Sequence, residues 1–335
     1  MPLSSCRLIQ RPTLPPPSSL SERPILIRGQ ERAENQRFLI EPQGFVPIKG
    51  TTREVILGGP GALVPLNFWG LAFLSLDNPG HPKLLKVEDS LCSPVSFFVR
   101  GRVGYEAERG FRLQVWDFSD PTSPVLRFQE ALPAFPISLV ENRGRLFVAC
   151  GGDGAVIYDV SEPFLPKRLS NFNDVEFTRR LAVDEDRLYL ADGNYGGLKI
   201  VDVSNPTSPT LLSRLLTADY ADDVLVRGNL VYVADRQGGA RIVDVSDPRN
   251  PFTPCIIWMP KNEVRDLQFF GRHYLLVADR NQGLRVYDIR DPERPLLVAD
   301  YSLRGPISKI TVREPYVYVA LWDQGVQVLR LTPPP

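Results

Sequence analysis

Charged side chains recur at one place in successive units of the second half of the chain, and their types could support acid–base chemistry or ligand recognition. They stand in the short sequences FTRR, YADD, EVRD and GPISK, which place Arg180, Asp223, Asp266 and Lys309 at equivalent positions. Neighbouring carboxylates such as Asp222 and Asp223 could act as general acid and general base if several loops assemble around a substrate. Opposite charges on a ring could instead pair with one another as weak surface ion pairs.

Two interpretations of this charged face therefore stay open. It is either a solvated rim of ion pairs, or a surface that recognises a protein partner or a small anion. The candidate residues for such recognition are Arg179, Arg180, Asp222, Asp223, Arg265, Asp266, Lys309 and Trp322.

Other signs of catalysis are weak. The chain has two histidines, His81 and His273, and neither has cysteine, histidine or carboxylate neighbours at metal-ligand spacing. Nucleophile-elbow, P-loop and dinucleotide-binding motifs are missing. The nearest match to a phosphate loop, GGPGA at Gly58, lacks the lysine and the following helix that such a loop needs. We predict no catalytic residue, no metal site and no cofactor. The pattern favours a non-catalytic protein and leaves enzymatic activity open.

A repeated phrase indicates which elements position the charged residues. The stretch KIVDVSNPTSPTLL, from Lys199 to Leu212, recurs along the chain with an aspartate at its centre and ends on paired prolines. Successive copies are 40, 42, 43, 42, 44 and 42 residues apart, a period typical of β-propeller blades. The central residues are Asp77, Asp117, Asp159, Asp202, Asp244, Asp288 and, in the last copy, Arg330.

Each unit has room for four short strands, separated by turns rich in Gly or Pro. The prolines of the phrase cannot continue a strand ladder, so they mark the connection from the third to the fourth strand. We predict an all-β, seven-bladed propeller of four-stranded blades. Asp192, Asp235 and Asp279 each follow an apolar second strand, and we expect them to accept hydrogen bonds in turns.

The repeated phrases LKIVDVSNPTSPTLL and ARIVDVSDPRNP, preceded by LYLADGNYGG and VYVADRQGG, resemble the LVIVD repeat family of WD40-like propeller repeats. The resemblance is strongest from Leu139 to Asp291 and extends from about Phe68 to Arg330. It implies the propeller fold. It implies no activity, because a fold does not determine a function.

Closure of the ring requires a strand from the N-terminal region, since the chain ends after three strands of the last blade. Residues 36–42 (QRFLIEP) are the favoured candidate and residues 23–29 (RPILIRG) the alternative. We therefore expect residues 1–35 to be a Pro-, Ser- and Arg-rich extension and residues 36–335 to form the propeller.

The outer strand CIIWMP, at residues 255–260, is apolar on both sides, whereas other outer strands carry charges. Ile256 and Trp258 share one of these sides, which predicts a protein contact on the outer flank. The alternative is that Trp258 covers a loop or the N-terminal extension of its own chain.

Composition narrows the choice of partners. The formal net charge is zero, which argues against nucleic acid, and we find no apolar segment long enough to cross a membrane. The four cysteines are scattered, so buried free thiols are expected. We expect a cytoplasmic protein. LSSC at residues 3–6 resembles a lipoprotein cleavage box and would indicate a periplasmic or surface lipoprotein if the true start lies upstream of Met1.

These observations predict a non-catalytic protein–protein interaction scaffold, as a subunit or assembly factor of a larger complex. The alternative is a small-molecule-binding, lyase or hydrolase propeller that uses the charged channel mouth.

Overall fold

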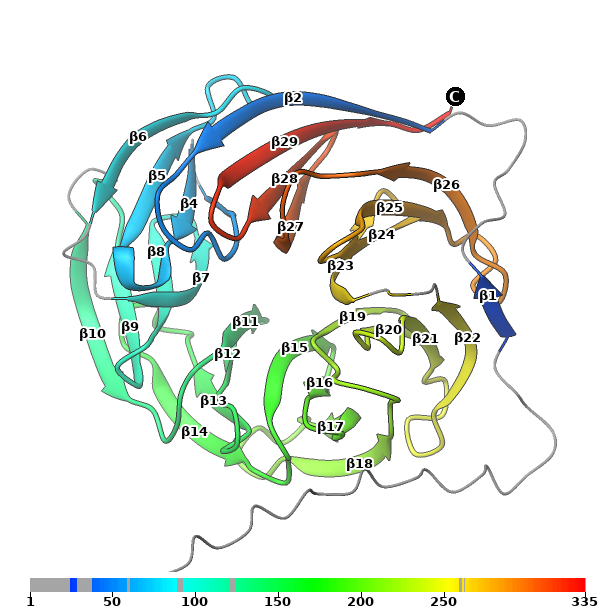
Figure 1. The fold of residues 1–335 in the computed structure, drawn as a ribbon. Coiled ribbons are helices and arrows are strands. Elements are labelled where there is room, and N and C mark those ends of the chain that lie inside the picture. The colour runs from blue at the N-terminus through cyan, green and yellow to red at the C-terminus, as the bar shows by residue number, and fades with distance from the viewer. Residues whose placement is uncertain are drawn as a thin grey trace, which may run out of the picture.

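The computed structural model describes residues 25–28, 38–58, 61–88, 93–120, 124–258, 261 and 263–334. In these ranges the one helix is the single turn η1 (Asn67–Trp69), and all other regular elements are strands. The strands form seven separate sheets that follow one another around a ring, as Figure 1 shows. The predicted all-β, seven-bladed propeller of four-stranded blades is therefore confirmed.

The first four blades are formed by consecutive strands. Blade one contains β3 (Ile56–Gly58), β4 (Gly61–Pro65), β5 (Leu71–Ser75) and β6 (Lys83–Glu88); blade two contains β7 (Pro94–Arg100), β8 (Val103–Glu108), β9 (Arg112–Asp117) and β10 (Val125–Ala131). Blade three contains β11 (Ser138–Asn142), β12 (Arg145–Ala149), β13 (Ala155–Asp159) and β14 (Lys167–Phe172); blade four contains β15 (Thr178–Asp184), β16 (Arg187–Asp192), β17 (Gly197–Asp202) and β18 (Thr210–Leu215).

The last three blades follow the same plan, with additions at the outer edge. Blade five contains β19 (Asp223–Arg227), β20 (Leu230–Ala234), β21 (Ala240–Asp244) and β22 (Phe252–Trp258), with β1 (Ile25–Arg28) beside β22. Blade six contains β23 (Val264–Phe270), β24 (Tyr274–Asp279), β25 (Gly283–Asp288) and β26 (Leu296–Tyr301). Blade seven contains β27 (Ile307–Arg313), β28 (Tyr316–Leu321), β29 (Gly325–Thr332) and β2 (Leu39–Pro47).

The second and third strands of a blade are nearly continuous apolar runs because both of their faces are buried. In β16, Leu188 and Leu190 pack into a cluster with residues of blade three, whereas Tyr189 and Ala191 pack into a cluster with residues of blade five. The pleat thus sends alternate side chains to opposite neighbours. The core lies between the blades, and each blade depends on the next one around the ring.

Glycine is required where the second strand turns into the third. Gly239 has a φ of +88°, and a Cβ there would lie 2.3 Å from the carbonyl oxygen of Ile257 on the outer strand. Gly283 has the equivalent place in blade six, with a φ of +98° and a carbonyl 2.2 Å from a Cβ. The repeated glycine is therefore fixed both by its left-handed backbone and by the close approach of the outer strand.

The repeated aspartates of the second-strand turns are fully buried and anchor the loop that enters the blade. Asp235 accepts hydrogen bonds from the backbone N–H groups of Ala218 at 2.9 Å and Asp219 at 3.0 Å, and from Nε of Arg241 at 2.7 Å. Asp192 and Asp279 accept from the equivalent incoming loops of blades four and six. These residues are acceptors as predicted, but only Asp279 accepts from its own turn, whereas the backbone donors to Asp192 and Asp235 lie in the loop that enters the blade.

Two segments near the N-terminus add to outer edges. β2 pairs antiparallel with β29, with Leu39 opposite Thr332 and Pro47 opposite Gly325. The strand thus continues five residues beyond the candidate segment 36–42. The alternative segment, 23–29, does not close blade seven: Ile25–Arg28 forms β1, which pairs in parallel with β22 of blade five. Apart from β1, the predicted extension lies outside the described residues.

Several smaller expectations can be compared with the described part of the chain. Cys150 and Cys255 are buried free thiols, and burial raises the pKa of each to about 12, as expected for inert core cysteines; Cys6 and Cys92 lie outside the described residues. Among the described residues, no helix has the length and apolar character to cross a bilayer, and His, Cys, Asp and Glu form no metal-binding group.

Candidate functional site

Seven equivalent residues on or just before the innermost strands surround the centre of the ring. In blades two to seven, each pairs with the alanine near the end of the second strand, and in blade one the residue precedes β3. We call this set the inner ring. Its members are Glu54, Ser96, Ser138, Arg180, Asp223, Asp266 and Lys309.

Glu54 is the anionic centre of one side of the inner ring. It accepts from Nζ of Lys309 at 2.8 Å and from Oγ of Ser96 at 2.8 Å, and Nη2 of Arg180 lies 4.0 Å from its Oε2. Burial alone would raise the pKa of Glu54, but Lys309 and Arg180 outweigh it and lower the pKa to about 2. Glu54 is therefore a carboxylate at every physiological pH.

Asp223 and Asp266 form a buried carboxyl pair on the other side. Asp223 accepts from the backbone N–H of Leu267 at 2.9 Å, and Asp266 accepts from that of Ile310 at 2.8 Å, so each ties its blade to the next. Burial raises the pKa of both groups, and the charge of Asp223 raises that of Asp266 further. The raised pKa values favour a state in which one of the two carboxyls keeps its proton.

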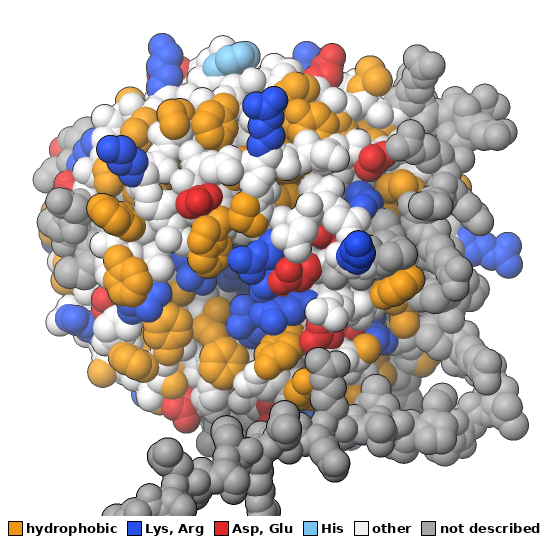
Figure 2. Space-filling model, viewed as in Figure 1, with side chains coloured by type: hydrophobic (Ala, Val, Ile, Leu, Met, Phe, Trp, Pro, Cys, Tyr) orange, Lys and Arg blue, Asp and Glu red, His pale blue; other side chains and the backbone are white. Residues whose placement is uncertain are grey.

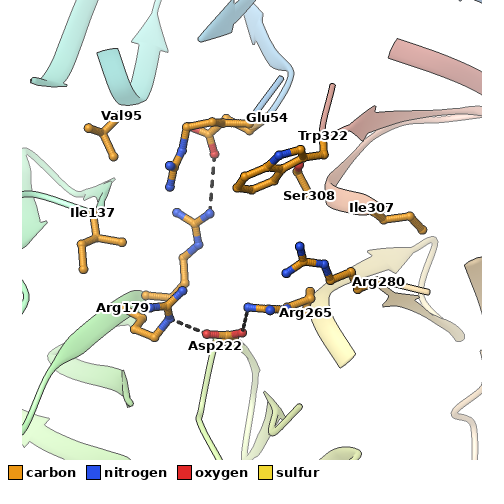
Figure 3. A pocket seen from close by; sticks show the side chains of 12 residues that line it. Glu54, Val95, Ile137, Arg179, Asp222, Arg265, Arg280, Ile307, Ser308 and Trp322 are labelled. Carbon is orange, nitrogen blue, oxygen red and sulfur yellow. Dashed lines mark hydrogen bonds and ion pairs between the residues drawn. The ribbon is translucent and has the colours of Figure 1, made fainter. Parts of the chain in front are cut away.

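A cavity of about 110 Å³ opens above the inner ring, on the face that carries the loops between second and third strands. Figure 3 shows Glu54 and Trp322 on one side of it and Arg179, Asp222 and Arg265 on the opposite side. We call it the central cavity. Its lining residues are Arg53, Glu54, Val95, Ile137, Arg179, Arg180, Asp222, Arg265, Arg280, Ile307, Ser308 and Trp322.

Asp222 organises the arginines on one wall of the central cavity. It forms ion pairs with Arg179, with Nε of Arg236 at 2.6 Å and with Nη1 of Arg265 at 2.7 Å. One buried carboxylate thus faces three guanidinium groups. Across the whole lining, five arginines stand against two carboxylates, a formal excess of three positive charges. In Figure 2 this excess is visible as a blue cluster at the centre of the face.

Arg53 is the arginine of this cluster without a counter-ion in contact. Its guanidinium makes no hydrogen bond or ion pair with any residue that the structure describes. Burial, together with the positive charges of Arg180, Arg109 and Arg179, lowers the pKa of Arg53 to about 10. A half-buried cation held among cations is unfavourable in the free protein, so this end of the cavity is suited to an anion.

Exposed aromatic side chains surround the central cavity on the same face. All five stand in loops between second and third strands, and their exposed fractions run from 43% to 68%. Arg109 lies over the ring of Phe68, 4.1 Å from its centroid, and Arg280 lies 5.6 Å from that of Trp322. We call this set the aromatic rim: Phe68, Trp69, Phe111, Tyr195 and Trp322.

The structure brings the predicted charged residues together and corrects their environment. The seven charged candidates and Trp322 all belong to the inner ring or line the central cavity, but the expected solvated rim is wrong for the carboxylates. Asp222, Asp223 and Asp266 are at most 5% exposed, because Asp223 and Asp266 stand on the innermost strands and Asp222 stands directly before one. Sequence reasoning missed Arg53 and Glu54. Glu54 could have been found by counting back one period of 42 residues from Ser96.

The outer-flank residues show the predicted alternation. Cys255 and Ile257 are buried, whereas Ile256 and Trp258 are half-buried on the other side of β22. Trp258 donates from Nε1 to the carbonyl of Gln237 at 3.0 Å, in a turn of its own blade. The indole N–H of Trp258 therefore has its hydrogen-bond acceptor within the same chain. A docking role for Ile256 and Trp258 stays a prediction.

Comparisons with known proteins agree with the fold. Among solved structures, the chain is similar to the computationally designed protein Ika8, with 9% identity, a TM-score of 0.65, and coverage of 87% of this chain and 99% of that one. At this identity the likeness shows the fold alone. A comparison with curated protein sequences gives no match. The family model of the LVIVD repeat matches residues 177–217, 218–253, 264–302 and 304–329, which lie in blades four to seven.

Proposed function

We propose that the protein is a non-catalytic scaffold that docks a protein partner on the face around the central cavity. The observation that carries this proposal is the juxtaposition of the aromatic rim with a cluster of half-buried arginines. Trp, Tyr and Arg are the residues that dominate binding energy at protein interfaces, where they surround a desolvated centre. The face in Figure 2 has this composition, with orange side chains around the blue cluster.

Backbone strain in two rim loops supports a role beyond folding. Phe111 and Tyr195 have φ values of +63° and +71°, in the left-handed region that favours glycine. Both side chains are also about half exposed, so they gain only part of the burial that an aromatic ring can gain. Residues kept in a strained backbone cost on the order of 1 kcal/mol or more, and such residues cluster at binding sites.

The size of the central cavity argues against the alternative, a lyase or hydrolase acting on a small organic substrate. Sites that enclose a small-molecule ligand usually measure about 300–1,000 Å³, whereas this cavity measures about 110 Å³. The buried carboxyl pair of Asp223 and Asp266 is 5% and 1% exposed and is not part of the cavity lining. The cavity is large enough for one functional group of a partner.

A paired substitution on the rim tests the docking function. Phe111→Gly with Tyr195→Gly removes two aromatic anchors and relieves two strained residues, so the fold should be as stable as the wild type or more stable. Partner capture from the native cell extract, measured by quantitative mass spectrometry, should fall at least tenfold. Phe252→Ser is the matched control, because this outer-strand aromatic is 42% exposed.

The opposite pattern would overturn the proposal. If the rim variant retains every specific partner while Ile256→Ser with Trp258→Ser loses them, docking occurs on the outer flank and not on this face. If neither variant changes capture, neither surface is the docking site.

A further inference from the structure

We infer that the central cavity is a binding site for a phosphate group, held by Arg53, Arg265 and Ser308. The inference rests on the proposed docking function only in one respect, the identity of the molecule that carries the phosphate group. Phosphate binding itself is measured without a partner, so the two proposals can fail separately.

The charge of the site matches a dianion. With the surrounding ion pairs included, seven cations stand against five carboxylates: Arg236 and Lys309 join the five lining arginines, and Asp223, Asp266 and Glu263 join Glu54 and Asp222. The excess is two positive charges, or three when one carboxyl of the Asp pair keeps its proton. A phosphate monoester carries about −1.5 to −2 charges at neutral pH, whereas a single carboxylate would leave at least one positive charge unbalanced.

Hydrogen-bond donors are also left over in the site. Nε of Arg265 and Oγ of Ser308 are buried and have no hydrogen-bond partner among the described residues, and the guanidinium of Arg53 likewise makes no hydrogen bond there. Each unpaired buried donor costs free energy in the empty site. A phosphate group presents three strong acceptor oxygens and pairs with guanidinium groups in a bidentate geometry, which suits these donors.

The walls of the cavity favour a compact oxyanion over a larger ligand. Val95, Ile137 and Ile307 contribute apolar side chains to the lining. A low local dielectric strengthens charge-assisted hydrogen bonds inside such a site. The volume of about 110 Å³ admits one phosphate group and leaves the molecule that carries it at the aromatic rim.

Inorganic phosphate is the first probe, applied to the full chain at constant ionic strength. Thermal unfolding should show a melting temperature that rises with phosphate concentration, since a ligand that binds only the folded state stabilises it. Chloride at the same ionic strength and acetate should produce no comparable rise. Isothermal titration calorimetry should give one site per chain.

Arg53→Gln separates binding from folding. The variant removes a cation that lacks a counter-ion, so its melting temperature without phosphate should equal or exceed that of the wild type, while its affinity for phosphate should fall at least tenfold. Arg53→Lys should recover part of the loss. Arg143→Gln is the matched control, because its side chain is 67% exposed in the turn between β11 and β12, at the opposite face, and it should bind as the wild type does. Ser308→Ala serves as a second variant and should weaken binding several-fold.

The source of the phosphate is distinguished by two further probes. A phosphoserine peptide that binds more than tenfold tighter than inorganic phosphate would identify a phosphorylated partner, and a sugar phosphate with that advantage would identify a metabolite. Equal affinities would leave free phosphate as the ligand. The inference is overturned if no phosphate probe binds better than chloride, if acetate binds as tightly as phosphate, or if Arg53→Gln keeps its affinity within twofold.

Discussion

Lys309 and Glu54 lie 255 positions apart in the sequence, and Nζ of Lys309 donates to Oε2 of Glu54 at 2.8 Å. The pair joins the innermost strand of blade seven to the segment that leads into blade one. Glu54 also accepts from Ser96 in blade two, and Thr311 of blade seven donates to the carbonyl of Val55. One carboxylate thus links three blades at the place where the first and last blades of the ring meet.

This ion pair makes stability depend on pH in the acid range. The pKa of Glu54 is lowered from 4.5 to about 2 in the folded protein, so its contribution is complete above about pH 4.5 and is lost as the pH falls toward 2. We expect this group to account for a loss of about 3 kcal/mol in unfolding free energy over that interval. Urea unfolding of Glu54→Gln at each pH should lack this part of the slope. A wild-type slope in the variant would contradict the assignment.

Glu106 should make the unfolding free energy depend on pH in the opposite direction, at higher pH. Burial raises its pKa from 4.5 to about 8, although Nε1 of Trp116 donates to it at 2.6 Å. A carboxyl with a raised folded pKa stabilises below its unfolded pKa and loses that contribution as the pH rises through the folded value. We therefore expect the wild type to lose on the order of 3 kcal/mol between pH 5 and pH 8 through this group. Glu106→Gln should be less sensitive to pH there; identical pH profiles would refute the prediction.

The anchoring aspartates should be far more important than Asp244 of the repeated phrase, which is only half-buried. Asp235→Ala removes three hydrogen bonds and leaves Arg241 without its carboxylate, so we expect a loss of about 3–5 kcal/mol in unfolding free energy. Asp244→Ala removes one exposed bond to the N–H of Ser246 and should cost about 1 kcal/mol. Chemical denaturation of both variants gives the comparison. Equal losses would show that the buried anchor has no special role.

Ring closure through β2 can be tested by two deletions. Removal of residues 1–24 leaves β1 and β2 in place and should leave the melting temperature nearly unchanged. Removal of residues 1–47 exposes the edge of β29, and we expect aggregation or loss of cooperative unfolding because an unpaired edge recruits other strands. Calorimetry and light scattering monitor the two outcomes. A cooperative, monodisperse product of the longer deletion would show that β2 is dispensable.

The outer flank gives a separate prediction for partner binding. Ile256→Ser with Trp258→Ser should reduce co-purification of a partner that uses β22, while circular dichroism and solubility of the isolated protein stay the same. A loss of solubility or structure in this variant would instead assign both side chains to packing within blade five.

The repeat explains why the fold could be predicted and parts of the site could not. A period near 42 residues assigns each strand a place, so the charged residues of blades four to seven were correctly aligned with one another. The period does not reveal burial, which depends on how the neighbouring blades pack around each position. Blade one lacks the repeated phrase before Phe68, so Arg53 and Glu54 had no motif to mark them. The parallel pairing of Ile25–Arg28 with β22 lies outside the repeat and could not be predicted from it.

The direction of the closing strand determines how the ring responds to mechanical load. Leu39, the first residue of β2, lies opposite Thr332, the last of β29, so the chain enters and leaves the closing pair at the same end. Tension between an attachment before Leu39 and one after Thr332 would act on a single pair of residues at a time and peel β2 away progressively. The same tension across a pair whose ends left in opposite directions would load all its hydrogen bonds together. The propeller should therefore open at low force from its closing blade first, while the other six blades remain folded.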